Sequence, residues 1–412
     1  MTKDFVTSPL RLLIAADTFP PNVNGAATFT QNLASGMAAR GLDVHVVTPA
    51  ASKRHGTWYE EYDGQRITVH RLPSDRWWPH DWLRYVKPWR ARAHMREVLD
   101  RVQPDVIHYQ SAVVLGRAAV REGASRGIRI IGTNHLMLEN MLEHTHIPKF
   151  LQGWASGIWW RDAHKTFAET AALTTPTRRA ADFLEQNGNL HDVLAISCGL
   201  RTSNYTPKFE EKSPKRILFV GRVTGEKQID VLLKAFAKLE GDDLFFDIVG
   251  TGDQLQHLQK LAKDLGVADR SKFHGYVTDQ ELRTIYADAT VFAIASIAEL
   301  QSIATMEAMA SGLPVVATNS MALPHLVHDG ETGLLFEPGS VEDAREKLQR
   351  VLDLPRDERE ALGRAGLKDV QAHDIDTTME LFERLYRGES VQSVGRDSVN
   401  EQDHSLDGLP KR

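Results

Sequence analysis

The sequence has very little cysteine and no long apolar run. A single cysteine, Cys198, among 412 residues cannot form an internal disulfide, which excludes a disulfide-stapled scaffold and favours a reducing cytosol. No stretch approaches the roughly 18 apolar residues of a membrane span. The apolar run at residues 10–16 is short, contains Arg11 and ends at Asp17, so it predicts a first β-strand and not a signal peptide. We therefore expect a soluble or peripheral protein.

An excess of basic charge is also missing. The formal net charge is −6, from 49 Lys and Arg against 55 Asp and Glu. Nucleic acid is therefore excluded as the main partner, because phosphate backbones are bound by basic surfaces. The remaining composition, 42% hydrophobic and 25% charged, is typical of a globular protein. At about 150 residues per domain, the length predicts two or three domains.

Strand and helix patterns alternate along the chain, which predicts parallel sheets covered by helices on both faces, an α/β fold. A helix that opens near Gly25 would place Phe29, Leu33 and Met37 on one face. The polar, proline-containing segment 204–214 predicts a linker, and the polar stretch 388–412 a disordered tail. The expected strands are 10–16, 44–48, 106–108, 129–132 and 173–175 before the linker, and 216–220, 244–249, 272–274, 291–295 and 314–317 after it.

Two carboxylates eight residues apart, Glu299 and Glu307, flank the start of a predicted helix near Ser302 and Ile303. If both were helical, their backbones would lie roughly 12 Å apart, farther than the roughly 5–9.5 Å between the carboxyl groups of a glycosidase pair. Acids so placed suit an elongated ligand held at two points, with helix N–H groups offered to an anion between them. Alternatively, Glu299 only caps the helix and Glu307 lies on a solvated face.

The loop 221–228 follows an expected strand and carries Arg222 and Lys227. Its glycines permit a tight turn at the carboxyl end of the strand, where open α/β sheets bind ligands. A guanidinium and an ammonium from one loop would together suit a diphosphate. A solvated basic turn is the alternative.

Three more strand ends carry candidate residues. The proline-rich turn after the first strand opens a helix, with Asn24 as a possible cap and Gly25 allowing close approach of a ligand. His135 follows the strand 129–132, although a lone histidine there is more often structural. The segment 250–255 resembles a dinucleotide fingerprint but has Leu255 in place of the third glycine, so we interpret it as a tight turn.

All eight tryptophans lie before residue 161, and several stand among cations. Residues 71–96 carry seven Lys and Arg against two Asp, a net charge of +5. Amphipathic rings beside cations favour the headgroup zone of anionic membranes, and core tryptophans beside a basic loop are the alternative. The tryptophans of this segment are Trp77, Trp78, Trp82 and Trp89, and a second aromatic set comprises Phe150, Leu151, Trp154, Trp159 and Trp160.

Together these motifs resemble the retaining glycosyltransferases of family 4, with their Glu-x7-Glu signature at Glu299 and Glu307. The resemblance covers nearly the whole chain before the tail and looks closest to actinobacterial GDP-mannose-dependent α-mannosyltransferases acting on glycolipids. It implies the GT-B architecture, two facing Rossmann-like parallel-sheet domains with a cleft between them. The implied parts are an acceptor domain over 1–203, a donor domain over 204–375, and a helix at 376–387 that returns to the first domain.

The resemblance also implies roles for the donor-site residues. Glu299 would contact the sugar hydroxyls and Glu307 the ribose, while Arg222 and Lys227 would bind the diphosphate. Ser302 and Ile303 would add the helix N-terminus, and Ser302 stands where the family usually has glycine.

Further roles follow from the same resemblance. Gly25 would lie beside the donor phosphate, and Val277 and Asp279, around a helix cap at Thr278 or Asp279, would contact the nucleobase. His135 would position or polarise groups near the transferring sugar and the acceptor hydroxyl.

The expected activity is therefore transfer of mannose from GDP-mannose, with retention, to a glycosyl diacylglycerol or phosphatidylinositol mannoside. We expect a cytoplasmic enzyme peripheral to the inner face of the plasma membrane. No metal or other cofactor is expected, because no acidic pair or His/Cys cluster has ligand spacing. A UDP-glucose- or UDP-galactose-dependent glycolipid enzyme is the alternative, followed by a non-catalytic nucleotide-sugar sensor and a nicotinamide oxidoreductase. The sequence does not specify the acceptor lipid, the linkage or the oligomeric state.

Overall fold

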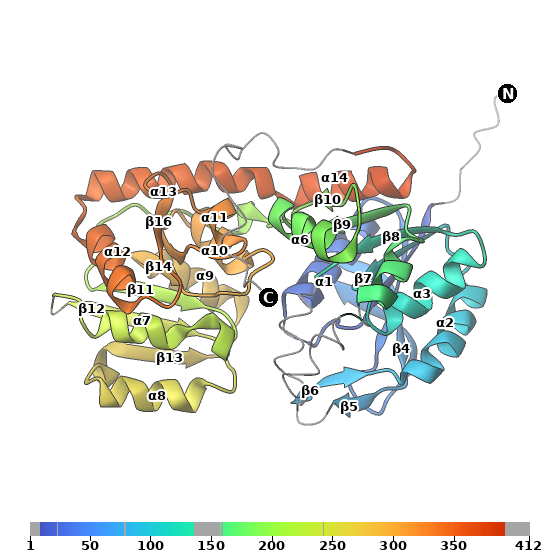
Figure 1. Cartoon of the computed structure of the whole chain (residues 1–412), viewed down its shortest axis with the longest axis horizontal. Helices are drawn as coiled ribbons and strands as arrows, with labels where there is room; N and C mark the ends of the chain where they lie inside the picture. The colour runs from blue at the N-terminus through green and yellow to red at the C-terminus, as the bar shows by residue number, and fades with distance from the viewer. Residues whose placement is uncertain are drawn as a thin grey trace. The chain divides into compact units, whose positions relative to one another are not determined.

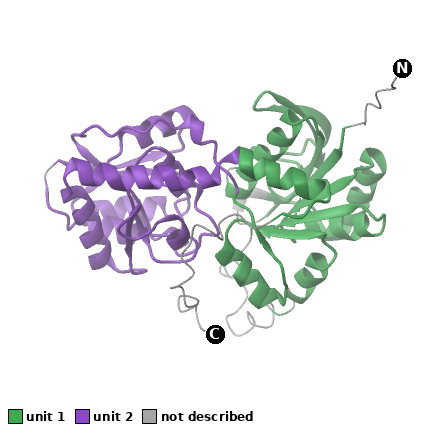
Figure 2. Cartoon of the chain, turned by 90° about the horizontal axis from the view of Figure 1, so that it is seen from above, with its two compact units in different colours: residues 1–197, 376–394 green, residues 198–375, 395–412 purple. Residues whose placement is uncertain are grey.

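The computed structural model (Figure 1) describes residues 9–391 apart from 23, 78–79, 136–156, 158–159 and 242. The chain forms two compact units, one of residues 1–197 with 376–394 and the other of residues 198–375 with 395–412 (Figure 2). Several sequence predictions lie outside the described residues: the tail beyond residue 391, Trp78, and most of the second aromatic set, namely Phe150, Leu151, Trp154 and Trp159.

Unit 1 contains an eight-stranded sheet in the order β10-β9-β8-β7-β1-β2-β4-β3 and a separate β5–β6 hairpin. All neighbouring strands of the sheet run parallel except β3 and β4. Its strands are β1 (Arg11–Ala16), β2 (Asp43–Pro49), β3 (Gly56–Tyr62), β4 (Gln65–Leu72), β5 (Asp75–Trp77), β6 (His80–Tyr85), β7 (Val106–Gln110), β8 (Arg129–Thr133), β9 (Ala172–Thr175) and β10 (Leu194–Ala195). Its helices are α1 (Gly25–Ala39), α2 (Pro88–Val102), α3 (Leu115–Ala124), α6 (Arg178–Gly188) and α14 (Ile375–Tyr386).

The first helix, α1, forms as the apolar spacing predicted. Phe29, Leu33 and Met37 are all buried, on the face that packs against the sheet. Asn24 caps the helix by accepting a hydrogen bond from the backbone N–H of Ala27 at 2.9 Å. Both the helix and its cap are therefore confirmed, because the capping chemistry and the apolar period agree on the same boundaries.

The hairpin β3–β4 was not expected from the sequence, although a signal for it exists. Asp63 and Gly64 connect the two strands with positive φ angles of 49° and 72°. An Asp-Gly pair with two left-handed residues is the usual two-residue hairpin turn. Ser35 of α1 fixes this turn by donating to the Asp63 carboxylate at 2.8 Å.

The last helix, α14, belongs to unit 1 although it comes almost at the end of the chain (Figure 2). Its Phe382 ring packs against Phe29 of α1, with 5.8 Å between ring centroids. The backbone carbonyl of Leu385 accepts a hydrogen bond from Arg129 of β8 at 2.9 Å. These contacts join α14 to both a helix and a strand of the same unit.

A buried histidine beneath α14 should make this unit sensitive to acid. His108 Nδ1 lies 2.6 Å from the Tyr386 hydroxyl, and Nε2 lies 2.7 Å from the Thr133 hydroxyl. Burial lowers the pKa of His108 from 6.5 to about 3, so the native state holds the ring neutral. Between those pH values the unfolded chain binds the extra proton. The stability that the neutral ring provides is therefore complete above pH 6.5 and is lost as pH falls toward 3.

We expect His108→Gln to destabilise the protein at pH 7, and the difference from wild type to shrink by up to about 1.4 kcal/mol for each pH unit below 6.5. Chemical denaturation at pH 7.0, 6.0, 5.0 and 4.5 measures that difference. A difference that stays constant with pH would show that the pKa of His108 is the same in the native and unfolded states.

Unit 2 has one parallel sheet of six strands in the order β13-β12-β11-β14-β15-β16. Two groups of helices cover the sheet (Figure 1). In one group α7 packs with α8 and α12, and in the other α10 packs with α13. Its strands are β11 (Lys215–Val220), β12 (Leu244–Val249), β13 (Ser271–Gly275), β14 (Val291–Ile294), β15 (Val315–Thr318) and β16 (Gly333–Phe336). Its helices are α7 (Ile229–Phe236), α8 (Leu255–Asp264), α9 (Asp279–Asp288), α10 (Ile303–Ala310), α11 (Leu323–Leu326), α12 (Val341–Asp353) and α13 (Arg356–Val370), with short 3₁₀ turns η1 (Thr202–Asn204), η2 (Gly225–Lys227), η3 (Ala268–Arg270) and η4 (Gln371–His373).

Both units thus have the Rossmann-like strand order, in which the chain builds outward from the centre, returns, and builds outward again. The predicted α/β fold class with two parallel-sheet domains is confirmed. Ten expected strands exist with boundaries shifted by at most two residues, whereas β3, β4, β5, β6, β10 and β16 were not expected. Within the described residues, every helix is too short or too polar to cross a lipid bilayer.

Candidate active site

In unit 2 the strand order reverses between β11 and β14, the two central strands. Ligands of open α/β sheets bind outside the carboxyl ends of the strands at such a point, because the two following loops diverge there. The loop after β11 carries Arg222 and Lys227, and the loop after β14 carries Glu299. The fold therefore places these three predicted residues at the position where a ligand is expected.

Lys227 and Glu299 form a close ion pair at this point. Lys227 Nζ lies 2.5 Å from Glu299 Oε1 and 3.5 Å from the Ser296 hydroxyl. The two side chains are only 11% and 13% exposed. The backbone N–H of Ile297 donates to the carbonyl of Glu226 at 3.1 Å, which ties the two loops together. A largely buried ammonium and carboxylate thus stand side by side, one suited to phosphate oxygens and the other to sugar hydroxyls.

Arg222 lies in the same loop but is far more accessible, with a side chain 48% exposed. One guanidinium nitrogen, Nη2, contacts Glu226 at 3.2 Å, and Thr224 also donates to that carboxylate at 2.7 Å. A guanidinium has five N–H donors, so this contact leaves donors for a ligand. Gln228, at the end of the loop, has a φ of 45°. This left-handed backbone is one that glycine adopts at little cost and other residues adopt less readily.

The helix that follows Glu299 begins at Ile303 and is capped by Ser302. The Ser302 hydroxyl accepts a hydrogen bond from the backbone N–H of Thr305 at 3.3 Å. The backbone φ of Ser302 is −96°, a value that any residue can adopt. Glu299 therefore does not cap the helix, and that alternative interpretation is wrong. Serine in place of the usual glycine fits because this backbone needs no left-handed residue.

Glu307 lies on α10 and is not a solvated carboxylate, so the second alternative interpretation is also wrong. It accepts hydrogen bonds from the hydroxyls of Tyr205 and Tyr286, at 2.8 Å and 2.9 Å. Burial raises the pKa of Glu307 above its usual value, and the nearby negative charge of Asp279 acts in the same direction. The structure thereby brings Asp279, a predicted nucleobase contact, into the neighbourhood of the predicted ribose contact.

Val277 and Asp279 stand at the turn between β13 and α9. Val277 packs against the hydrophobic core of unit 2, and Asp279 is the exposed first residue of α9. Thr278 is the cap predicted there, and it forms a capping box with Glu281. Tyr276, which we did not single out from the sequence, is strongly exposed in the same turn.

The glycines of the segment 250–252 have a purely structural explanation. A Cβ on Gly250 would lie 1.8 Å from the carbonyl oxygen of Gly221, and one on Gly252 would lie 2.1 Å from that of Val223. The backbone N–H of Val223 donates to Thr251 at 2.9 Å. These glycines therefore let the loop after β12 pack directly against the loop that carries Arg222 and Lys227.

Unit 1 has its own reversal of strand order, between β1 and β7. Asp17, at the end of β1, accepts from the backbone N–H groups of Leu115 and Val114 at 3.0 Å and 3.3 Å. Burial raises the pKa of Asp17 to about 6. The N-terminus of α3 is therefore already occupied by a carboxylate of the protein. Gly25 is the first residue of α1, and the loop that follows β1 leads into it.

His135, the predicted catalytic residue of unit 1, follows β8. Its Nε2 lies 2.9 Å from Gln110 Oε1, and its ring packs against Phe29 with 4.9 Å between centroids. Burial lowers the pKa of His135 to about 4, so the ring is neutral at physiological pH. Gln110, only 3% exposed, was missed by the sequence interpretation. A polar residue that ends a buried strand at the carboxyl edge is the signal that marks it.

The basic, tryptophan-rich segment 71–96 contains the end of β4, the strands β5 and β6, and the first part of α2. Part of its charge is internal. Arg71 is buried and binds the Glu60 carboxylate through two nitrogens, at 2.6 Å and 2.9 Å. Lys87 pairs with Asp75 at 3.2 Å. The sequence count of cations therefore overstates the positive charge that this segment offers to a partner.

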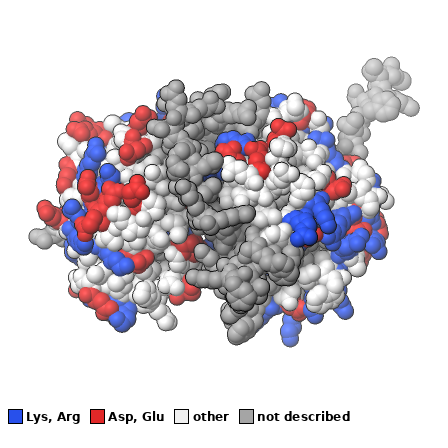
Figure 3. Space-filling view, in the orientation of Figure 1, with Lys and Arg blue, Asp and Glu red and all other residues white. Residues whose placement is uncertain are grey.

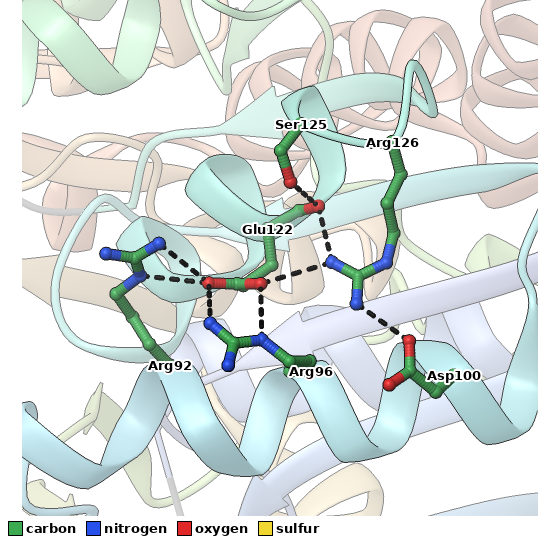
Figure 4. A network of polar contacts seen from close by, with 6 residues as sticks. All are labelled: Arg92, Arg96, Asp100, Glu122, Ser125 and Arg126. Atoms are coloured by element: carbon green, nitrogen blue, oxygen red, sulfur yellow. Dashed lines mark hydrogen bonds and ion pairs between the residues drawn. The ribbon is translucent and has the colours of Figure 1, made fainter.

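Lys and Arg side chains gather on the part of unit 1 that carries α2 and α3 (Figure 3). Glu122 of α3 lies at the centre of a network there (Figure 4). Its buried carboxylate contacts Arg92 and Arg96 of α2 and Arg126 after α3, at 2.8 Å, 3.2 Å and 3.1 Å. Arg92 and Arg96 hold α2 against α3 and still expose about half of their side chains. Trp89, one helical turn before Arg92, is 74% exposed.

Comparisons with known proteins identify the class of enzyme. Residues 23–204 match the family described as Glycosyltransferase Family 4, and residues 203–369 match the family described as Glycosyl transferases group 1. A GDP-mannose-dependent alpha-mannosyltransferase of Corynebacterium glutamicum is 28% identical, over 83% of this chain and 80% of its own. An alpha-monoglucosyldiacylglycerol synthase of Streptococcus pneumoniae is 24% identical, over 79% of this chain and 75% of its own.

The fold agrees with these matches. The structure of Anabaena HepE in complex with UDP and glucose superposes with a TM-score of 0.70 at 15% identity, covering 92% of this chain and all of the other. Within the described residues, no cluster of three or more His, Cys, Asp or Glu side chains is placed to hold a metal ion. With both families matched, one in each half, the chain is a glycosyltransferase of family 4 and group 1 type with the GT-B fold.

Proposed function

We propose that this glycosyltransferase transfers mannose from GDP-mannose to a membrane glycolipid, a glycosyl diacylglycerol or a phosphatidylinositol mannoside, with retention at the anomeric carbon. The observation that carries the proposal is the Lys227–Glu299 pair at the reversal point of unit 2, with Arg222 on the same loop. The Corynebacterium relative is named for GDP-mannose and the Streptococcus relative for a glycosylated diacylglycerol, and both names support the donor and acceptor classes.

The residues of unit 2 suggest how the donor would be activated. Lys227 and Arg222 would stabilise the negative charge that develops on the departing diphosphate, and one well-placed donor of this kind is typically worth about 3 kcal/mol. Glu299 would orient the sugar through its hydroxyls. A phosphate oxygen of the leaving group would take the proton of the attacking acceptor hydroxyl on the same face, which gives retention without a covalent enzyme intermediate.

The residues of unit 1 would serve the acceptor. His135 is neutral, so it would position or polarise the acceptor hydroxyl through hydrogen bonding. Gly25 would allow the start of α1 to approach the donor phosphate. Since Arg222 and Lys227 would both face the diphosphate, we propose that no metal is required, and transfer should persist in excess EDTA.

The direct test is incubation of the purified protein with labelled GDP-mannose and a lipid extract, followed by identification of the labelled lipid. Parallel reactions with UDP-glucose and UDP-galactose test the alternative donor class. Labelled lipid from a UDP-sugar alone would overturn the mannosyl proposal and favour that alternative. Donor binding without transfer to any lipid or release of sugar would instead identify a nucleotide-sugar sensor.

The exposed start of α2 suggests how the enzyme reaches a lipid acceptor. Trp89, Arg90, Arg92 and Arg96 are exposed over the first two turns, and no acidic residue lies in the first turn. Arg92 and Arg96 also pair with Glu122 and so have a structural role. A cation near a helix N-terminus is unfavourable for the helix dipole, so helix stability does not explain Arg90. An exposed indole among arginines suits the headgroup region of an anionic bilayer.

We expect Trp89→Ala combined with Arg90→Ala to weaken binding to vesicles containing phosphatidylglycerol by about tenfold, since each basic residue near an anionic surface is worth about 1 kcal/mol and an interfacial indole adds to it. Flotation at low and high salt measures the effect. Tyr59→Ala is the matched control, because Tyr59 is a similarly exposed aromatic on the edge strand β3. If wild type, the double variant and Tyr59→Ala all float equally, the start of α2 is not the membrane contact.

A further inference from the structure

We propose that Tyr205 and Tyr286 are positioning residues that hold the Glu307 carboxylate in the orientation needed to bind the ribose cis-diol of the donor nucleotide. This inference rests on the proposed function and on the ribose contact that the family resemblance implies for Glu307. Neither tyrosine belongs to the Glu-x7-Glu segment, and they come from two other stretches of the chain.

The geometry places one hydroxyl on each carboxylate oxygen. Tyr205 donates to Oε1 at 2.8 Å and Tyr286 donates to Oε2 at 2.9 Å. A carboxylate can accept about four hydrogen bonds, so each oxygen keeps a site for another donor. Two adjacent oxygens, each with one site left, match two adjacent hydroxyls such as those at ribose C2′ and C3′.

The tyrosines are themselves fixed by packing. Tyr286 of α9 is fully buried, and its ring contacts Phe292 of β14 with 6.1 Å between centroids. The Tyr205 ring meets the Tyr286 ring edge to face, also at 6.1 Å. With both donors immobile, the carboxylate of Glu307 has one favoured rotamer. A protein side chain that is held in its binding conformation in this way loses little conformational entropy when a ligand binds.

Structural stability alone does not explain this arrangement. Removing a carboxylate from water is unfavourable, and a well-packed apolar side chain at such a position is often at least as stable. Burial still raises the pKa of Glu307 despite its two hydroxyl donors, so the carboxylate is not fully compensated. A partly compensated acceptor on α10, the helix that follows the loop carrying Glu299, is suited to gain its remaining hydrogen bonds from a ligand.

The test is calorimetric titration with GDP and with 2′,3′-dideoxy-GDP, and with the corresponding uridine pair. Wild type should bind the ribose form at least about tenfold more tightly, as expected for hydrogen bonds to a charged group. Tyr205→Phe and Tyr286→Phe should each reduce that preference several-fold and leave affinity for the dideoxy nucleotide within about twofold. Glu307→Gln should reduce the preference further, and Tyr59→Phe should leave it unchanged.

The outcomes distinguish failure of the proposed function from failure of the role proposed for the two tyrosines. If wild type binds neither nucleoside diphosphate, the proposed function fails and this inference fails with it. If wild type prefers ribose and both tyrosine variants prefer it equally, only the inference is overturned. Should Tyr286→Phe not fold, because its side chain is fully buried, Tyr205→Phe decides the question, since Tyr205 is only partly buried.

Discussion

Replacement of Lys227 by alanine should reduce the rate of sugar transfer by at least about 100-fold, the usual effect of removing one preorganised donor that stabilises transition-state charge. Lys227 is largely buried, is held by the Ser296 hydroxyl and Glu299, and stands at the reversal point of the unit 2 sheet. Lys227 is the only lysine of the loop 221–228. Initial rates at saturating donor and acceptor measure the effect.

The variant should also lose stability, for a separable reason. Without the ammonium, the buried Glu299 carboxylate has no counter-charge, and breaking such a pair on one side typically destabilises by up to about 3–5 kcal/mol. The double variant Lys227→Ala with Glu299→Gln removes both charges and should recover much of that stability without recovering activity. Activity that returned together with stability would mean that Lys227 is only structural.

The matched control is Lys234→Ala. Lys234 lies one element further along, on α7, and pairs with Asp230 at 2.7 Å in an exposed i,i+4 arrangement. Exposed pairs of this kind contribute little to stability, so this variant should turn over normally. A similar loss of activity in both variants would point to the net charge of the unit and not to a site.

Replacement of Gly250 by alanine should be among the most destabilising single changes in unit 2, by about 3 kcal/mol or more. The added Cβ would lie 1.8 Å from the Gly221 carbonyl oxygen, and the φ of 131° is one that other residues rarely adopt. Because the obstacle is backbone, either the loop after β12 or the loop carrying Arg222 must move. Thermal and chemical denaturation measure the stability change, and nucleotide binding should weaken with it.

Gly266→Ala provides the comparison. Gly266 also has a positive φ, 72°, but no atom lies within 4 Å of the Cβ that would be added. This variant should therefore show only the conformational cost of a left-handed alanine, about 1 kcal/mol. Equal effects of the two substitutions would mean that φ alone matters and that the loops adjust freely.

The strand pattern of both sheets could be predicted because buried parallel strands form continuous apolar runs. The runs that became β1 and β11 are examples, each followed by a glycine- or proline-rich turn. The hairpin β3–β4 was missed because β3 alternates between half-buried and exposed residues and resembles a polar loop when the Asp63-Gly64 turn is overlooked. Short edge strands such as β16 have too few residues to give a periodic signal.

The candidate site was predicted only in part. Arg222, Lys227, Glu299 and Glu307 were found because they stand at fixed spacing in motif-like segments. The tyrosines that bind Glu307, Tyr205 and Tyr286, were not found, because nothing in the neighbouring sequence marks them. Tyr205 lies 102 residues from Glu307, inside a polar segment that we interpreted as a linker.

The amino-acid sequence alone determined that this chain builds two parallel-sheet units and which loops end at the carboxyl edges of their strands, since these properties depend on local apolar pattern and turn chemistry. The tertiary structure decided which charges meet. Lys227 and Glu299, 72 residues apart, become partners because β11 and β14 pair directly where the strand order reverses. It also decided that Arg71 is internal and that Glu307 is held by two hydroxyls, because burial and partner choice arise from packing between distant segments.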